Sequence, residues 1–222
     1  MRNDPARRLS PHDRTDTVLA ASIGRHLMRT CRAALVALGA GDDDATLTIA
    51  RVKTPQAPAV LAASHADAPA RRAMQAVYER CLAHYRDVVR PADAARGVDD
   101  VGAAAAHFVA ENVRALRGAT VDAGARRPLE RQLGALLRAT PAWTRASAQE
   151  RQLWFEKLAT LAVFMHEAAD QAVLQGDAAI DHVRRAAGSY LHELLGVDPN
   201  QLDVGPEGMS LRLLGALAPH GA

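Results

Sequence analysis

The spacing of the apolar residues constrains the fold of this chain more than any other feature of its sequence. In six segments they recur every three or four positions, which places them along one side of an α-helix. Glycine, proline and aspartate stand at the ends of these segments, where helices commonly begin and end. We therefore expect the all-α class, a single helical bundle of about six helices. The helices are predicted at about residues 15–38, 67–90, 99–118, 128–140, 147–176 and 177–195.

The fifth of these helices has the clearest boundaries. Ser147 is followed three residues later by Glu150, which is the spacing of a capping box, where each side chain accepts a hydrogen bond from the other residue's backbone N–H. Gly176 ends the helix, and Asp177 is expected to cap the sixth. Aromatic residues make up only 4% of the chain, and this composition also favours packed helices over a β-sandwich.

Two short parts of the chain depart from the helical pattern. Residues 46–52 alternate like a short extended strand, and Pro55 and Pro58 predict an extended loop after it. Near the C-terminus, alternating segments on either side of the sequence GPEG predict a small hairpin. We expect residues 1–66 to form an N-terminal amphipathic helix plus extended loop, and residues 67–222 to form the main helical domain with a C-terminal tail.

Charge and hydropathy exclude several classes of protein. Lysine and arginine exceed aspartate and glutamate by only 2, so the chain lacks the basic excess of a nucleic-acid-binding protein. The first apolar stretch contains arginines and cannot be an ordinary transmembrane helix, and the polar residues before it do not resemble a signal peptide. We expect a cytoplasmic protein, with export by a route that needs no signal peptide as the open alternative. Cys31 and Cys81 fall on apolar stripes and are expected to be reduced, buried thiols rather than a disulfide.

Two pairs of histidine and carboxylate residues are spaced by one helical turn: His107 with Glu111, and His166 with Asp170. The second pair lies in the sequence HEAAD, which resembles the zinc-protease motif H-E-x-x-H with aspartate in place of the second histidine. If these pairs converge, the protein could be a metal- or small-ligand-dependent enzyme with a His/carboxylate site between helices. Cys81 with His84 would be a third such pair.

The sequence favours a simpler interpretation of these polar residues. On the fifth helix, Glu156, His166, Glu167 and Asp170 are expected to form the exposed edge of a core helix. No glycine-rich phosphate loop, nucleophile elbow or Cys-x-x-Cys motif is present. We therefore assign no catalytic residue, metal ligand or cofactor from the sequence.

Two further features admit both a structural and a functional interpretation. Asn112 lies on an apolar stripe, where its amide either bonds within the core or lines a ligand pocket. Arg25, Arg29 and Arg32 share one side of the first helix, residues 15–38. That helix either packs on the bundle or presents an interaction surface to a partner or an anionic membrane.

Three stretches carry a family resemblance: GVDDVGAAAAHFVAEN, TPAWTRASAQERQLWFEKLATLAVFM and AAGSYLHELLGVDPNQLDVGPEGMSL. Their order and spacing resemble an uncharacterised bacterial domain-of-unknown-function family of mostly helical proteins, over about residues 74–212. The resemblance implies one helical domain with the terminal tail packed back on it, and it draws attention to Asn112, Gln152 and Glu156. Many relatives begin with an export signal, whereas this chain begins with a polar segment.

The sequence thus favours a non-enzymatic helical binding or accessory protein over an enzyme, without deciding between them. Its partner is expected to be another protein or a second copy of the chain. The expected core stripes are complete and the predicted site residues do not include a recognisable catalytic triad.

Overall fold

The computed structural model describes residues 47–212, and this part of the chain contains eight α-helices and two short antiparallel strand pairs. The predicted all-α class is confirmed. The predicted first helix, with Arg25, Arg29 and Arg32, lies outside the described residues. Among residues 47–212, no helix combines the length and the apolar character needed to cross a membrane.

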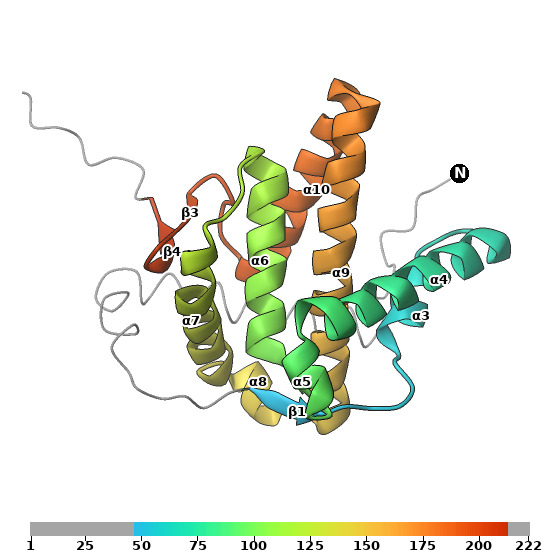
Figure 1. Cartoon of the computed structure of the whole chain (residues 1–222), viewed down its shortest axis with the longest axis vertical. Coiled ribbons are helices and arrows are strands. Elements are labelled where there is room, and N and C mark those ends of the chain that lie inside the picture. The colour runs from blue at the N-terminus through green and yellow to red at the C-terminus, as the bar shows by residue number, and fades with distance from the viewer. Residues whose placement is uncertain (1–46, 213–222) are drawn as a thin grey trace, which may run out of the picture.

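Five long helices form the bundle around α6 (Figure 1). α6 packs against α9, α10 and α7, and α4 packs against α9. The core is continuous across these contacts and includes Leu82, Val109, Leu133, Phe155 and Leu191. The five helices are α4 (Ala68–His84), α6 (Val101–Arg117), α7 (Arg126–Arg138), α9 (Ala148–Gln175) and α10 (Asp177–Leu195).

The ends of α6 and α9 follow from their sequences. Asp100 caps α6 by accepting a hydrogen bond from the backbone N–H of Ala103, and Gly118 ends the helix with a φ of +68°. The predicted capping box of α9 is confirmed, because Ser147 and Glu150 cap each other's backbone N–H groups. Beyond Gly176 the chain turns back into α10, so the two helices project together from the bundle (Figure 1).

Three short helices were not predicted, and each has a proline at its first or second position. Pro58, Pro91 and Pro141 each occupy the first turn, where a helix does not need the missing N–H. The sequence pattern predicts an extended loop at Pro58. The prediction of an extended loop is therefore wrong over residues 57–62, which are helical. The three helices are α3 (Ala57–Ala62), α5 (Pro91–Ala95) and α8 (Pro141–Arg145).

The second predicted helix changes its geometry before it ends. After α4, the residues Tyr85–Val89 form a single π-helical turn, η1, which the backbone N–H of Arg90 closes by bonding to the carbonyl of Tyr85 at 2.9 Å. Such turns are rare and are frequently found at functional sites. A 3₁₀ turn, η2 (Ala123–Ala125), precedes α7.

The predicted strand near residues 46–52 is confirmed as β1 (Thr48–Ala50). Its antiparallel partner β2 (Val98–Asp100) was expected to be the start of a helix. β1 and α3 both contact α9, so residues well before the predicted boundary at residue 66 are packed on the main helices. The boundary itself stays a prediction.

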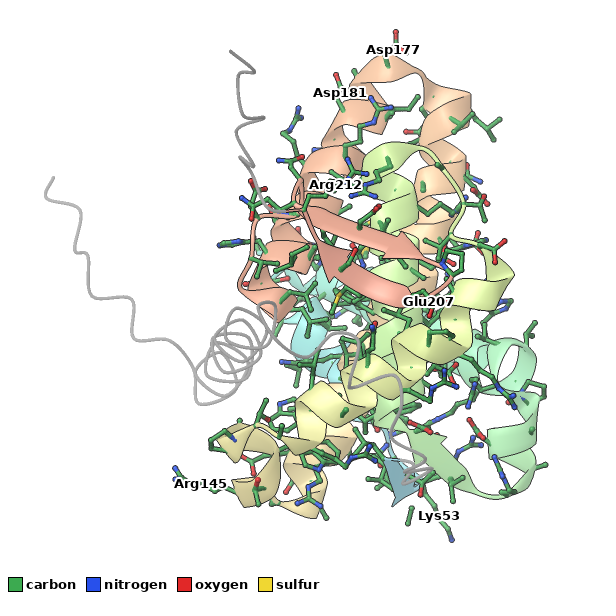
Figure 2. The ribbon with its side chains drawn as sticks, turned by 90° about the vertical axis from the view of Figure 1, so that its left-hand side faces the viewer. Lys53, Arg145, Asp177, Asp181, Glu207 and Arg212 are labelled. Carbon is green, nitrogen blue, oxygen red and sulfur yellow. The ribbon has the colours of Figure 1, made fainter. Side chains whose placement is uncertain are left out.

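The predicted C-terminal hairpin is confirmed as β3 (Leu202–Gly205) and β4 (Gly208–Leu211), and it lies across the bundle (Figure 2). Arg117 of α6 bonds to Asp203 at 3.0 Å, and Gln132 of α7 accepts a hydrogen bond from the backbone of Met209 at 2.6 Å. Gly208 has a φ of +96°, and a Cβ atom there would collide with the side chain of Gln132. The tail is thereby fixed to α6 and α7.

Candidate functional site

Three of the four residues in the predicted His/carboxylate site come together, but around Arg114, which was not among the predicted site residues. His166 Nδ1 lies 2.9 Å from Glu111 Oε2, and His166 Nε2 lies 3.6 Å from Asp170 Oδ2. Arg114 bonds to Glu111 at 3.0 Å and to Asp170 at 2.8 Å. The result is an ion-pair network that joins α6 to α9. Arg114 follows Glu111 by three residues, a spacing that could have indicated the pair.

The guanidinium of Arg114 determines what this network can do. Burial raises the pKa of Glu111, but the hydrogen bond with His166 and the charges of His107, His166 and Arg114 outweigh burial and hold it below its usual value. A cation already lies between the carboxylates, and within residues 47–212 no three His, Cys, Asp or Glu side chains are grouped as metal ligands. We interpret the network as a link between helices, and the metal-dependent alternative stays a prediction.

Glu156 contradicts its predicted place on an exposed edge. His166 and Asp170 have side chains 45% and 54% exposed, as an edge requires, but Glu156 is only 1% exposed. Its Oε2 accepts hydrogen bonds from the backbone N–H groups of Gln56 and Ala57, at 2.8 and 3.0 Å. These are the N–H groups at the start of α3, which have no partner within their own helix. Glu156 therefore binds the start of α3 to α9.

Glu156 belongs to a larger buried network at the base of the bundle. Gln152 bonds to both Glu156 and Asp99, at 3.2 and 3.1 Å. Asp99 in turn accepts two hydrogen bonds from Arg86, at 3.2 and 2.6 Å, and its side chain is 1% exposed. The network thus ties β2 and η1 to α9. The sequence drew attention to Gln152 only through a family resemblance, and to Glu156 also as an expected edge residue, but it did not mark Arg86 or Asp99 as members of a network.

Asn112 is fully buried, and its amide N–H bonds to the carbonyl of Phe108 at 2.8 Å. Its Oδ1 atom has no hydrogen-bond partner among the described residues. Asn112 does not line either of the two cavities described below. These contacts favour the expected core role over a ligand-binding one.

A small polar cavity of about 110 Å³ lies between η1, α6 and α7. The cavity exists because three of the α6 residues that line it are alanines, whose side chains end at Cβ. The π-helical turn supplies the opposite wall. The polar residues that line the cavity are Tyr85, Arg90, His107, Arg126 and Glu130.

The hydroxyl of Tyr85 is the most unusual group in this cavity. The side chain is 1% exposed, and its ring packs edge-on against His107 and Phe155 at 5.6 and 5.8 Å between centroids. No atom of residues 47–212 is positioned to hydrogen-bond with its hydroxyl. Burial strongly raises the pKa of Tyr85, so the hydroxyl keeps its proton and can donate it. Leaving such a group unpaired costs about 1–3 kcal/mol.

Of the two arginines that line the cavity, only one has a guanidinium that is free to bind a ligand. Arg90 is held by Asp93 at 2.6 Å and by Glu130 at 3.1 Å. Arg126 is exposed and forms no ion pair with another described residue. Burial lowers the pKa of His107 to about 4, with the charges of Arg126 and Arg90 acting in the same direction and Glu111 opposing them. At neutral pH the cavity therefore offers a neutral phenol, a neutral imidazole and a free cation.

The pKa of His107 predicts a specific pH dependence of stability. The unfolded imidazole titrates near 6.5, and the folded one near 4, so the unfolded chain binds the extra proton between these values. Stability is thus lost as the pH falls from 6.5 towards 4, by up to about 2 kcal/mol between pH 7 and pH 5. We expect His107→Gln to lose less unfolding free energy than the wild type over this interval in urea titrations. Equal losses in both proteins would contradict the assignment.

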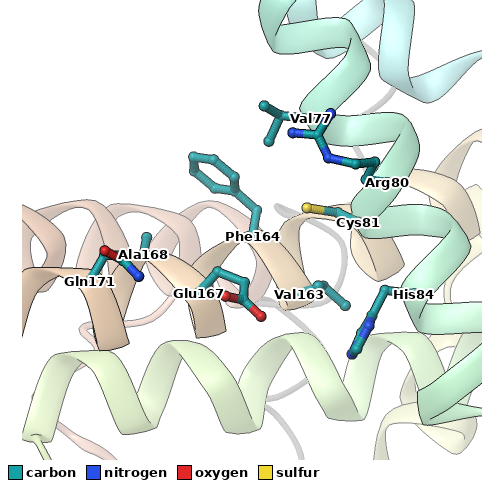
Figure 3. A pocket seen from close by; sticks show the side chains of 9 residues that line it. All are labelled: Val77, Arg80, Cys81, His84, Val163, Phe164, Glu167, Ala168 and Gln171. Atoms are coloured by element: carbon teal, nitrogen blue, oxygen red, sulfur yellow. The ribbon is translucent and has the colours of Figure 1, made fainter.

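A second, larger hollow of about 460 Å³ opens between α4 and α9. Its floor is apolar, with Val77 and Cys81 on α4 and Val163, Phe164 and Ala168 on α9. Figure 3 shows the thiol of Cys81 pointing from α4 into the angle between the helices, near the ring of Phe164. Polar side chains line the remainder of this groove: Arg80, His84, Glu167 and Gln171.

Comparison with known proteins places the chain in a family. A family model described as "Family of unknown function (DUF6683)" matches residues 21–212, which confirms and extends the resemblance seen in the sequence. Neither a curated protein nor a solved structure matches the chain. The residues of the polar cavity and of the groove all lie inside the matched range. The chain therefore belongs to DUF6683, a family of unknown function.

Proposed function

We propose that this protein is a non-enzymatic binding protein that holds a small carboxylate in the cavity between η1, α6 and α7. The observation that carries this proposal is the buried hydroxyl of Tyr85, a residue that lines the polar cavity, because this hydroxyl has no hydrogen-bond partner among residues 47–212. A bound acceptor atom would satisfy it. Buried polar groups in folded proteins nearly always have such a partner.

The size and charge of the cavity define the ligand. A cavity of roughly 150 Å³ accommodates benzene, so the smaller volume here suits about four or five heavy atoms. Of the two arginines in the lining, Arg90 is already paired with Asp93 and Glu130, so Arg126 is the cation that a ligand could meet. A carboxylate would accept hydrogen bonds from Arg126, Tyr85 and the N–H of His107. Charge-assisted hydrogen bonds of this kind are the strong ones.

The same groups are poorly suited to catalysis. A general base works best when its pKa lies near the working pH, and the pKa of His107 is lowered to about 4. Tyr85 has a raised pKa and does not ionise readily. These properties support binding rather than reaction. The partner, the bacterial origin and the cytoplasmic location expected from the sequence stay predictions, and this proposal does not depend on them.

Binding of acetate tests the proposal, with acetamide as the uncharged molecule of the same shape. At constant ionic strength, we expect acetate but not acetamide to raise the thermal unfolding midpoint of the full chain. Tyr85→Phe should bind acetate about tenfold more weakly, a loss of about 1.4 kcal/mol, without losing stability in the absence of ligand. Arg126→Gln should remove the preference for acetate over acetamide.

Tyr78→Phe is the control, because Tyr78 is also a buried tyrosine but lies on α4 and does not line the cavity. It should bind acetate as the wild type does. If Tyr85→Phe and Tyr78→Phe bind acetate equally well, or if acetamide stabilises the protein as much as acetate, the cavity is not a carboxylate site.

A further inference from the structure

The polar cavity between η1, α6 and α7 offers a hydrogen-bond acceptor as well as donors. Its donors are the hydroxyl of Tyr85, the guanidinium of Arg126 and the N–H of His107, and the proposed carboxylate would use all of them. Among the described residues that line the cavity, Glu130 is the only one with a carboxylate. A ligand that is only a carboxylate offers this group no partner, so the lining suits a molecule that also carries a donor.

Glu130 is able to accept a further hydrogen bond. Its Oε1 atom accepts one from Arg90 at 3.1 Å, and its Oε2 atom accepts none from another described residue. The side chain is 32% exposed, and burial is the main reason that the pKa of Glu130 is raised, although the charge of Arg90 opposes this change. A partly buried carboxylate with one unused oxygen is stabilised by a donor placed beside it.

The space and the local charges indicate what kind of donor the ligand carries. The cavity suits about four or five heavy atoms, so it can hold one more atom than acetate contains. Arg90 lies against Glu130 and is also paired with Asp93 at 2.6 Å, so the charge of Glu130 is already balanced. An ammonium group beside Glu130 would be repelled by this guanidinium, whereas a hydroxyl carries no charge. A hydroxyl next to the carboxylate therefore fits best.

We infer that the ligand is a 2-hydroxy carboxylate of the size of glycolate, whose hydroxyl donates to Glu130 while its carboxylate binds Arg126 and Tyr85. This inference rests on the proposed carboxylate site and adds the class of molecule that the site selects. Glu130 is then a specificity-determining residue, because a site that binds a ligand hydroxyl discriminates against the analogue that lacks it.

Glycolate and propionate form a matched pair of probes, since propionate has a methyl group in place of the hydroxyl and the two molecules are otherwise the same. Their affinities for the full chain are measured by isothermal titration calorimetry at neutral pH and constant ionic strength, beside those of acetate and glycine. We expect glycolate to bind about tenfold more tightly than propionate, which is the effect of one hydrogen bond to a charged group. Glycine, with an ammonium in place of the hydroxyl, should bind more weakly than glycolate.

Two variants test whether Glu130 causes this preference. Glu130→Leu removes the acceptor and should bind glycolate and propionate equally well. Asp93→Asn is its control, because Asp93 is the other partner of Arg90 but does not line the cavity, and it should keep the preference for glycolate. The ratio of the two affinities is compared within each protein, so that a general weakening of binding cancels. Circular dichroism confirms that each variant is folded.

The outcomes distinguish this inference from the proposed function. If acetate binds, and propionate binds as tightly as glycolate, the carboxylate site stands but the preference for a hydroxyl is overturned. A preference for glycolate that survives in Glu130→Leu, or tighter binding of glycine than of glycolate, also overturns the inference. If none of these ligands binds, the proposed function and the inference both fail. The comparison of glycolate with propionate in the wild type decides the question even if a variant does not fold.

Discussion

Replacing Asp99 with alanine is expected to destabilise the protein by about 3–5 kcal/mol, because it leaves the charge of Arg86 buried without its partner. The Arg86 side chain is 10% exposed and both of its hydrogen bonds to Asp99 would be lost. Gln152 would lose a partner as well. The effect is measured as the change in unfolding free energy in urea, or as loss of helical circular dichroism if the variant does not fold.

Two further variants separate this explanation from a general sensitivity to losing a carboxylate. Asp181→Ala removes an exposed partner of Arg184, 3.6 Å away, and should change stability by less than about 1 kcal/mol. Asp99→Ala combined with Arg86→Met removes both charges and should be more stable than Asp99→Ala alone. If the double variant is less stable than the single one, an unpaired charge is not the cause.

Phe155→Ala is expected to cost a similar amount, about 3–5 kcal/mol, because it empties a large volume in the core. The side chain is 1% exposed and lies between the buried network and the polar cavity. Its ring packs against Tyr85 on one side, and the guanidinium of Arg86 lies 5.5 Å from its centroid. Urea unfolding measures the loss of stability. Acetate titration of the folded fraction should show weaker binding as well, since Tyr85 would lose the contact that positions it.

Phe164→Ala is the control for this substitution, because Phe164 is only partly buried at the edge of the groove. It should cost clearly less stability than Phe155→Ala and should leave acetate binding unchanged. If the two substitutions lower the unfolding free energy equally, the burial of Phe155 contributes no more to stability than the partly buried position of Phe164. If Phe155→Ala binds acetate as tightly as the wild type, the packing of Phe155 does not position the groups of the cavity.

The candidate site could be predicted only in part, and the residues show why. His107 was selected because Glu111 follows one turn later, yet it lines the polar cavity and its ring packs on Tyr85. Tyr85 and Arg126 carry no sequence signal of their own. A tyrosine on an apolar stripe is usually a core residue, and an arginine at the start of a helix is usually solvated. Tyr85 and Arg126 line the same cavity only because η1, α6 and α7 pack together.

The local signals in the sequence were sufficient for features that depend on neighbouring residues. The capping box at Ser147, the glycine that ends α6, the β1 strand and the terminal hairpin all depend on backbone geometry within a few positions. The spacing of apolar residues likewise determined the long helices, because a stripe of one helix must be buried against another.

The tertiary structure decided everything that depends on which faces meet. The sequence could not show that Glu156 is buried, because its partners are backbone N–H groups about one hundred positions earlier in the chain. It also could not show that Pro58 starts a helix rather than a loop, since α3 is stabilised by that same distant carboxylate. Periodicity defines the faces of a helix, but burial, charge pairing and cavities arise only when those faces pack together.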